Sequence, residues 1–380
     1  MQYPITLGVL GGGQLAKMLA SEAYRMGMNI SIIENGYNSP AGEMTKSDFG
    51  LGWNNREELD KFIDSADLIT LENEFIDPDI LEYIEQSKPV FPSAKTLRQI
   101  QDKFIQKTVF SSAGVAVPEF EKLDTLEDTF LFGEKHGFPY VIKSRKMGYD
   151  GYGNATIYNN DDAKEAWDKF KATSNRSDLY AEEFVDFTTE LAVMIARNQS
   201  GEVEVYPVVE TIQRNHICNE VIAPARIPES AKEQAIQFAK KCVETIDGIG
   251  IFGIEFFLTN DNQILVNEIA PRPHNTGHYT IEACETSQYE NAIRAVANLP
   301  LGSSKMIRPG AAMVNLLGTR SGSSAPSEVN ELFAMRNVSL HLYHKKDCRV
   351  GRKMGHITVL GDSPDEAYSR AMEAFGKFQF

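Results

Sequence analysis

The chain has 380 residues, which is enough for two or three domains around a large hydrophobic core. Its formal net charge of −15 argues against general nucleic-acid binding, because no basic surplus is available to neutralise phosphates. No run of 18 apolar residues could span a membrane, and the first residues lack the basic and apolar regions of a signal peptide. The four cysteines lie far apart and form no CxxC motif, so we expect reduced thiols and a cytoplasmic location.

The first part of the chain predicts a Rossmann-like α/β unit. Residues 5–10 form a buried-strand pattern, a run of glycines follows, and a helical pattern leads to a second strand at 30–34. The spacing Gly11-x-Gly13-x-x-Ala16, followed by Glu34, is similar to the fingerprint of dinucleotide-binding enzymes such as NAD-dependent dehydrogenases. A tight glycine-rich turn without a bound dinucleotide explains the same pattern, and the residues alone leave both explanations open.

Three further segments extend this unit. Residues 67–71 and 89–91 are strand patterns, and the first of them ends in Glu72-Asn73-Glu74. Acidic side chains at that position lie where open α/β sheets bind ligands. Ser93 can cap one long helix that runs to about Ser112 and contains Lys103.

From residue 114 the pattern changes to a compact α+β unit with strands at 140–143 and 179–185. Lys143 ends an apolar strand, which is an unfavourable place for a charge unless it meets an anion. The loop at 147–154 has three glycines within six residues and can fold over phosphates as a flap. Taken alone this loop is a weak signal, because many hairpins contain similar sequences.

The strongest chemical signal is a predicted hairpin at residues 254–269. Two β-rich runs flank a turn centred on Asp261–Asn262, which would place Leu258 opposite Leu265 and Glu255 opposite Glu268. The two carboxylates would then share a face, with Cβ atoms roughly 5 Å apart. The apolar neighbours expected on that face are Phe257, Thr259, Ile264 and Val266.

Two facing carboxylates in apolar surroundings call for a cation. Mg²⁺ suits the position because it binds carboxylates together with substrate phosphates. A solvated strand end is the alternative, and a register slip of one residue would remove the argument.

The C-terminal third contains helical patterns at 229–247 and 280–299 and a strand at 338–344. Five basic residues then lie within nine positions of this acidic chain, namely Lys345, Lys346, Arg349, Arg352 and Lys353. A site for a substrate phosphate explains this cluster, and so does a solvated hairpin tip.

Together these features resemble the ATP-grasp ligases, and within them the 5-(carboxyamino)imidazole ribonucleotide synthetase family of purine biosynthesis. The matching motifs cover essentially the whole chain: GGGQL at 11–15, TxExE at 70–74, VIK at 141–143, GYDGxG at 148–153, AEEFV at 181–185, PAR at 224–226, VNEIAPRPHNxGH at 266–278, NLLG at 315–318 and RKMGH at 352–356. The resemblance implies an ATP-grasp architecture that combines α/β and α+β units. Its parts would be a Rossmann-like domain at 1–112, a small lid domain at 113–186 and a mixed-sheet domain at 187–380.

The resemblance also implies ATP and Mg²⁺ as cofactors and a homodimer as the assembly. The reaction would join bicarbonate to 5-aminoimidazole ribonucleotide through carboxyphosphate. It would give 5-carboxyamino-imidazole ribonucleotide, ADP and phosphate.

The family implies a role for each matching residue. Mg²⁺ would bind Glu255 and Glu268. The reacting centre would include Tyr149, Asp150, Arg272, His274, Asn275 and Lys345, with Asp150 and His274 both open as general base. The nucleotide would contact Lys103, Lys143, Gly148, Tyr149, Asp150, Gly151, Tyr152, Gly153, Asn154, Glu182, Glu183, Phe184, Val185, Glu190, Gln213, Asn267 and Glu268. The ribonucleotide would contact Gly13, Gln14, Leu15, Glu74, Lys345, Arg352 and Lys353.

The sequence departs from the family pattern at five positions. In the flap this chain has Tyr152 and Asn154, where the family commonly has a basic residue and Gln. Lys103 replaces a common Arg, and Ala16 and His344 each replace a common Gly. Within the superfamily, formate-dependent glycinamide ribonucleotide transformylase and biotin carboxylase are the nearest alternatives, although no biotinyl-acceptor motif is present. A non-catalytic nucleotide-binding regulator is a third class, which the glutamate pair disfavours.

Overall fold

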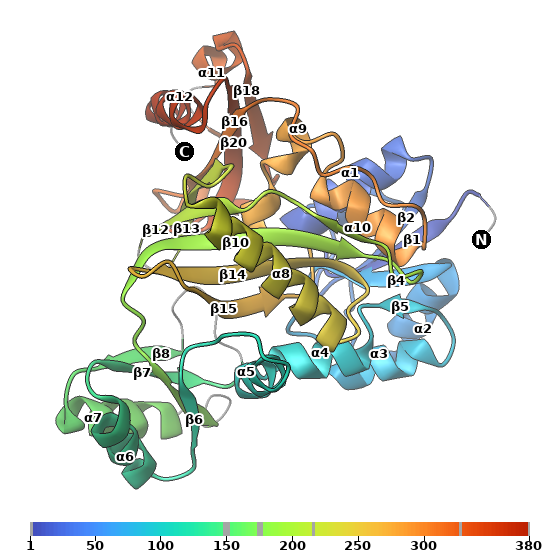
Figure 1. Cartoon of the computed structure of the whole chain (residues 1–380). Coiled ribbons are helices and arrows are strands. Elements are labelled where there is room, and N and C mark those ends of the chain that lie inside the picture. The colour runs from blue at the N-terminus through green and yellow to red at the C-terminus, as the bar shows by residue number, and fades with distance from the viewer. Residues whose placement is uncertain (1–2, 147–152, 173–177, 215–216, 327–328, 379–380) are drawn as a thin grey trace.

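The computed structural model describes residues 3–146, 153–172, 178–214, 217–326 and 329–378. Over these residues the strands form sheets of five, four and nine strands and one two-stranded ribbon (Figure 1). This architecture confirms the predicted combination of α/β and α+β units. The strands of each large sheet fall within one of the three predicted domains, while the boundaries at 112 and 186 stay predictions.

The first sheet is parallel throughout, with the strand order β3-β2-β1-β4-β5. Its strands are β1 (Thr6–Leu10), β2 (Asn29–Ile33), β3 (Ser47–Phe49), β4 (Leu68–Leu71) and β5 (Val90–Phe91). Helix α1 (Gln14–Arg25) and the short η1 (Gly42–Met44) pack on one face, and α2 (Arg56–Ser65) and α3 (Pro78–Glu85) cover the other. Because β1 and β4 are parallel neighbours, the glycine turn after β1 lies beside residues 72–74.

The predicted long helix at 93–112 is wrong, because the chain forms two helices, α4 (Ala94–Gln101) and α5 (Lys103–Ser112). Asp102 interrupts them with an extended backbone, and its Oδ1 accepts hydrogen bonds from the N–H groups of Phe104 and Ile105 at 3.1 Å. The same carboxylate binds Arg145, with Nη2 to Oδ2 at 2.6 Å. The break makes Lys103 the first residue of a helix instead of an interior one.

We expect Asp102→Ala to lower the free energy of unfolding by about 3 to 5 kcal/mol. The change removes a helix cap and leaves the guanidinium of Arg145, which is 17% exposed, without its carboxylate. Asp102→Asn keeps the cap acceptor and should cost less. Urea unfolding followed by circular dichroism measures both variants, and a loss below about 1 kcal/mol for Asp102→Ala would show that this break is not stabilised as described.

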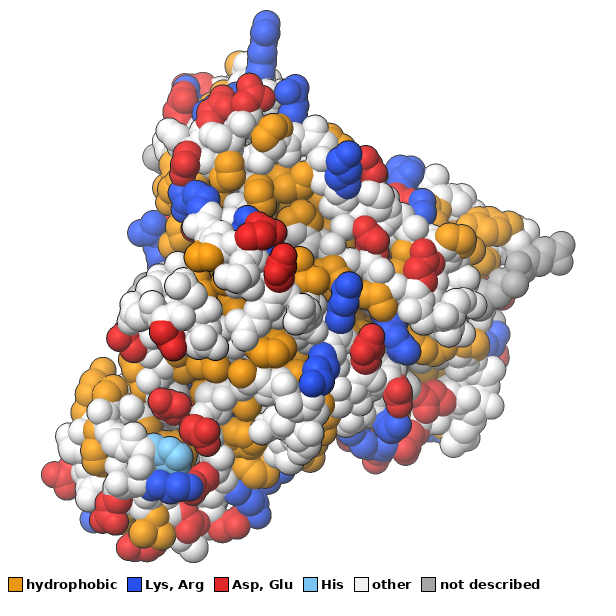
Figure 2. Space-filling view, in the orientation of Figure 1, with side chains coloured by type: hydrophobic (Ala, Val, Ile, Leu, Met, Phe, Trp, Pro, Cys, Tyr) orange, Lys and Arg blue, Asp and Glu red, His pale blue; other side chains and the backbone are white. Residues whose placement is uncertain are grey.

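The second sheet is antiparallel, with the strand order β6-β9-β7-β8. It contains β6 (Phe120–Leu123), β7 (Tyr140–Ser144), β8 (Asn154–Ile157) and β9 (Leu179–Glu183). Helices α6 (Leu126–His136) and α7 (Asn160–Lys171) pack on one face, and the unit projects from the rest of the molecule (Figure 1 and Figure 2). We call this projecting unit the lobe and the rest of the molecule the body. Phe104 of α5 packs against Tyr180 and Phe120, and this contact joins the lobe to the body.

The third sheet has nine strands in the order β15-β14-β10-β12-β13-β16-β20-β18, with β11 beside β10. Its strands are β10 (Phe187–Arg197), β11 (Val203–Val205), β12 (Val209–Arg214), β13 (Ile217–Ala223), β14 (Gly250–Thr259), β15 (Ile264–Ala270), β16 (Gly310–Leu317), β18 (Val338–Leu342) and β20 (Lys353–Gly361). The helix α8 (Glu229–Thr245) covers β10 and β14 on one face, and α12 (Pro364–Gly376) packs on β16 and β20. The short α11 (Asn330–Ala334) lies beside β18, and β17 (Gly322–Ser323) pairs with β19 (Asp347–Cys348).

The predicted helix at 280–299 is also divided, into α9 (Thr280–Ala283) and α10 (Gln288–Val296), after the short η2 (Asn275–Gly277). The hydroxyl of Ser287 caps α10 by accepting the N–H of Glu290 at 3.1 Å, and Cys284 forms an isolated β-bridge with Met306. An extended connection with its own β-bridge therefore interrupts the helical pattern.

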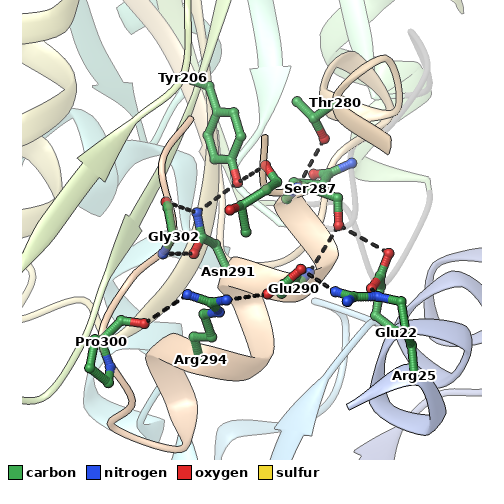
Figure 3. A network of polar contacts seen from close by, with 12 residues as sticks. Glu22, Arg25, Tyr206, Thr280, Ser287, Glu290, Asn291, Arg294, Pro300 and Gly302 are labelled. Atoms are coloured by element: carbon green, nitrogen blue, oxygen red, sulfur yellow. Dashed lines mark hydrogen bonds and ion pairs between the residues drawn. The ribbon is translucent and has the colours of Figure 1, made fainter. Parts of the chain in front are cut away.

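Helix α10 links the first sheet to the third through the polar network in Figure 3. The carboxylate of Glu290 pairs with Arg25 on α1 and with Arg294 one turn later. Asn291 donates to the hydroxyl of Tyr206 at 2.8 Å and bonds both backbone groups of Gly302. These contacts fix the position of α1, and hence of the glycine turn, against the nine-stranded sheet.

The described helices include none with the length and apolar character needed to cross a membrane. On the face shown in Figure 2, acidic and basic side chains are interspersed over the body and the lobe.

Candidate functional site

The predicted glutamate pair is present on the hairpin of β14 and β15, where Glu255 lies directly opposite Glu268. The register that produces this pair is not the predicted one. Leu258 faces Ile264 instead of Leu265, and a three-residue loop ends in Asn262 with φ 62°. A β-bulge at Asn267, between the pairs Phe256–Val266 and Glu255–Glu268, restores the pairing of the two glutamates.

The bulge also changes which side chains accompany the glutamates. Ile264 and Val266 lie in the core with Phe256, so their predicted place on the glutamate face is wrong. A shift of one residue moves every side chain of a strand to the opposite face, and the bulge reverses this shift only from Glu268 onwards.

The two carboxylates have opposite pKa shifts. Burial, the nearby Glu268 and Glu190 raise the pKa of Glu255 to about 8. Burial acts on Glu268 in the same direction, but Lys103, whose Nζ lies 2.5 Å from Oε2, outweighs it and lowers the pKa of Glu268 to about 2. The pair therefore holds one negative charge and one proton near neutral pH, and an added cation would displace that proton.

The donor set fits a hard cation that takes most of its ligands from elsewhere. Among the described residues, no group of three or more His, Cys, Asp or Glu side chains is arranged to hold a metal ion. The two facing carboxylates, with Asn267 directly before Glu268, supply only part of the coordination shell of Mg²⁺. Oxygens of phosphate or water would be needed to complete that shell. Glu190, on the neighbouring strand β10, faces Phe257, and burial raises the pKa of its carboxyl to about 7.

Lysines from two elements approach this hairpin. Lys143 is the last residue but one of β7, close to its predicted place at the strand end, and its described partner is Glu182 of β9, with Nζ to Oε1 at 2.5 Å. Lys107 of α5 binds the other oxygen of Glu182 at 2.7 Å and donates to the backbone carbonyl of Asn267 at 3.1 Å. The segment that follows turns outward, because Glu183 and Phe184 are exposed.

The residues after β15 add a cation and a neutral imidazole. Arg272 binds Glu74, with Nη2 to Oε1 at 2.8 Å. His274 contacts the hydroxyl of Thr276 through Nδ1 at 2.9 Å, and its Nε2 lies 3.8 Å from Glu255. Burial, with the charges of Arg272 and Lys353, lowers the pKa of His274 to about 3.

Asn275 is held by a reciprocal amide pair. Its Nδ2 donates to Asn315 at 2.9 Å, and its Oδ1 accepts from Asn315 at 2.6 Å. These bonds explain the buried position of Asn275 structurally, and its predicted catalytic role stays a prediction.

The glycine turn contacts the protein's own carboxylates. Glu72 accepts the N–H of Gly13 at 2.7 Å and the N–H of Ala16 at 3.3 Å, and Glu34 accepts the N–H of Gly12 at 3.0 Å. The anion position at the start of α1 is therefore filled by Glu72. This geometry favours the tight-turn explanation of the glycine pattern over a dinucleotide site.

The basic segment divides into an exposed tip and a buried part. Arg349 is 70% exposed and lies 3.9 Å from Asp347, as expected of a solvated tip. Lys345 and Lys353 are partly buried, and burial together with the charges of Arg352 and Lys353 lowers the pKa of Lys345 to about 8. Lys353 also lowers the pKa of His274, which places this cation near the glutamate hairpin.

Three family models match successive parts of the chain: the ribonucleotide synthetase preATP-grasp domain at 5–101, the ATP-grasp domain at 108–289 and the phosphoribosylaminoimidazole carboxylase C-terminal domain at 311–370. The N5-carboxyaminoimidazole ribonucleotide synthase of Synechococcus elongatus is 39% identical over 355 residues, which cover 93% of this chain and 89% of that protein. The chain belongs to the N5-carboxyaminoimidazole ribonucleotide synthetase family.

Solved structures of this family have the same fold. The N5-carboxyaminoimidazole ribonucleotide synthetase from Thermotoga maritima superposes with a TM-score of 0.88 at 41% identity, covering 99% of both chains. A carboxyaminoimidazole ribonucleotide synthase from Aspergillus clavatus, complexed with ATP, has a TM-score of 0.89 at 36% identity over 98% of this chain and 97% of that one. Some relatives are longer, since this chain spans 66% of the phosphoribosylaminoimidazole carboxylase of Schizosaccharomyces pombe, which is 39% identical over 371 residues.

Two departures from the N5-carboxyaminoimidazole ribonucleotide synthetase family pattern have a visible context. His344 has φ 59°, a conformation that suits the glycine common in the family, and its Nδ1 lies 2.9 Å from Glu43. Ala16 directs its N–H toward Glu72, which a glycine at this position could do equally.

The other predicted residues of the site have mixed positions. Gly148, Tyr149, Asp150, Gly151 and Tyr152 lie outside the described residues. Gly153 accepts the N–H of Ser144 at 2.8 Å, and Asn154 faces Lys143 across β7 and β8. Leu15 belongs to the core, so only its backbone could meet a ligand, whereas Gln14, Val185 and Gln213 are partly buried.

The sequence predictions miss two residues of the site. They include Glu72 only as part of a motif, and they do not include Lys107. Lys107 offered one signal, because it lies three residues after Phe104 on the apolar side of the helical pattern, where a charge needs a partner.

Proposed function

We propose that this protein carboxylates the amine of 5-aminoimidazole ribonucleotide with bicarbonate at the expense of ATP. The products would be 5-carboxyamino-imidazole ribonucleotide, ADP and phosphate. The observation that carries the proposal is the facing pair of Glu255 and Glu268, with Lys103 paired to Glu268. Membership of the family supports it, and a related structure from Aspergillus clavatus is described in complex with ADP and 5-aminoimidazole ribonucleotide.

The first step would transfer the terminal phosphoryl group of ATP to bicarbonate, which gives carboxyphosphate. This reaction needs positioning and neutralisation of charge more than covalent help from the protein. Glu255 and Glu268 would hold Mg²⁺, which when bound would neutralise the phosphate oxygens. Lys103 neutralises Glu268 in the described structure, and Lys143 and Arg272 are the further cations available for the phosphates.

The second step would deliver the carboxyl group to the substrate amine. Carboxyphosphate is short-lived in water, so the loop at 147–154 would close over it and exclude solvent. The lowered pKa of His274 makes its imidazole a weak base near neutral pH. This favours Asp150, which lies outside the described residues, as the group that removes the amine proton.

The ribonucleotide phosphate would bind at the buried part of the basic segment. Glu72 fills the start of α1, which leaves Lys345, Arg352 and Lys353 as the cations for a phosphate on this side. We expect Arg352→Met to raise the KM for 5-aminoimidazole ribonucleotide about tenfold or more, because a charge-assisted contact to phosphate is lost. Steady-state kinetics at saturating ATP measures this change.

The matched control for that variant is Arg349→Met, at the exposed tip of the same segment. It should leave the KM unchanged. Equal effects of the two substitutions would show that the segment acts only through its general charge, and an unchanged KM in Arg352→Met would remove Arg352 from the site.

ADP release tests the proposed function itself. ADP should form when ATP, Mg²⁺, bicarbonate and 5-aminoimidazole ribonucleotide are all present, and omission of the ribonucleotide or of bicarbonate should suppress it. Release of ADP only with formate and glycinamide ribonucleotide would reject the proposal in favour of the transformylase. An NAD titration without a binding signal is expected, since Glu72 fills the anion position of α1.

We also propose that the protein is a cytoplasmic homodimer. The homodimer follows from the family resemblance, and the four cysteines are free and buried, as expected of a reducing compartment. Light scattering coupled to size-exclusion chromatography measures the assembly, and a monomer at micromolar concentration would contradict the dimer.

A further inference from the structure

One carboxylate in the site binds two lysines. Glu182 meets Lys107 at 2.7 Å through Oε2 and Lys143 at 2.5 Å through Oε1. The side chains of Glu182 and Lys107 are each 2% exposed, whereas that of Lys143 is 13% exposed. Burial opposes ionisation of Glu182, but the two ammonium groups outweigh it and lower the pKa of this carboxyl. Burial also lowers the pKa of Lys107, and the charge of Glu182 opposes that effect. With both lysines protonated, the cluster has two cations and a single anion.

The two lysines are held differently. Lys107 lies on the buried side of α5 and has a second fixed contact, since its Nζ also donates to the carbonyl of Asn267 at 3.1 Å. Asn267 is the bulge residue beside Glu268, so Lys107 connects the hairpin of β14 and β15 to Glu182. Lys143 is near the end of β7, is more exposed, and already acts electrostatically on Glu268.

We propose that Lys107 is a positioning residue that serves as the permanent counter-ion of Glu182, so that Lys143 is free to move from Glu182 onto the phosphates of a bound nucleotide. The inference rests on the proposed function, in which Lys143 contacts those phosphates. A buried carboxylate that loses its only cation is strongly destabilised. With Lys107 in place, Glu182 remains paired when Lys143 leaves, and the transfer of Lys143 carries no such penalty.

The proposal is tested by the affinity for Mg²⁺–ADP, measured by isothermal titration calorimetry. Lys107→Met should weaken binding roughly tenfold or more, because Lys143 is then the only cation of Glu182. Affinity for 5-aminoimidazole ribonucleotide should stay unchanged. The side chain of Glu182 is 2% exposed and each of its oxygens is paired with a lysine, so the predicted nucleotide contact of Glu182 would be made by its backbone. Glu182→Gln keeps that backbone and should bind Mg²⁺–ADP at least as tightly as the wild type, since Lys143 is released.

The double variant Lys107→Met/Glu182→Gln separates this role from a merely structural one. Once Glu182 is neutral, Lys143 no longer needs a replacement, so the double variant should recover most of the affinity that Lys107→Met loses. If Lys107 acted only by packing or by anchoring the bulge, the double variant would bind as weakly as Lys107→Met, and the proposal would be overturned.

Arg294→Met is the matched control, because it removes one of the two cations of another buried carboxylate, Glu290, away from the hairpin. It should leave Mg²⁺–ADP affinity unchanged, and thermal unfolding of every variant shows which are folded.

If Lys107→Met does not fold, weaker binding by Glu182→Gln overturns the proposal on its own. Wild-type protein that fails to bind Mg²⁺–ADP would contradict the proposed function, whereas equal affinity of the wild type and a folded Lys107→Met would contradict this inference alone.

Discussion

Glu268→Gln is expected to reduce Mg²⁺-dependent ADP formation at least about 100-fold. Mutation of residues that only support metal ligands already lowers metal affinity or activity about 10- to 100-fold. The glutamine keeps the size of the side chain and removes its charge. Lys103, which lies 2.5 Å from that carboxylate, would lose its anion, and Mg²⁺ would retain only Glu255. ADP release at saturating ATP, measured over a range of Mg²⁺ concentrations, provides the test.

Glu290→Gln is the control for loss of a buried, ion-paired glutamate. Glu290 is 8% exposed and pairs with Arg25 and Arg294, so this change should lower stability while Mg²⁺-dependent turnover is kept. Unchanged turnover in a folded Glu268→Gln variant would refute a role of Glu268 in binding the metal.

The affinity for Mg²⁺ in the presence of ADP is expected to rise with pH up to about pH 8. The ordinary pKa of a glutamate is 4.5, but burial, Glu268 and Glu190 raise the pKa of Glu255 to about 8. Below that pH the free protein carries a proton on Glu255 that the metal must displace. The apparent affinity should therefore increase about tenfold for each pH unit below 8 and become constant above it.

Calorimetry at a series of pH values between 6.5 and 9 measures this dependence. Glu255→Gln should bind Mg²⁺ more weakly and remove the slope assigned to Glu255, which also corrects for titration of the nucleotide. A slope that is the same in Glu255→Gln and in the wild type would mean that Glu255 does not bind the metal.

The chemistry of the hairpin was predictable because it depends on local signals. A turn between two β-rich runs predicts the pairing of Glu255 with Glu268, and the structure confirms it. The prediction reached the right pair through the wrong register, because neither the three-residue loop nor the bulge at Asn267 has a clear signal in the sequence. The side chains around the pair were therefore assigned to the wrong face.

The remaining differences come from contacts between distant parts of the chain. Asp102 ends one helix and begins another while it binds Arg145, which lies 43 residues later. Glu72 caps the glycine turn from 59 residues away, so a pattern that resembles a dinucleotide site becomes a self-contained turn. Periodicity within one segment cannot show such partners. The family resemblance supplied the overall architecture, which no single segment specifies.

The most direct test is a crystal structure of the protein grown with ADP and Mn²⁺, which replaces Mg²⁺ and has an anomalous signal. An anomalous peak between the carboxylates of Glu255 and Glu268, in contact with the phosphates of ADP, is the predicted result. A peak elsewhere, or ADP bound with both carboxylates directed away from its phosphates, would contradict the central claim that this pair holds the metal for the nucleotide.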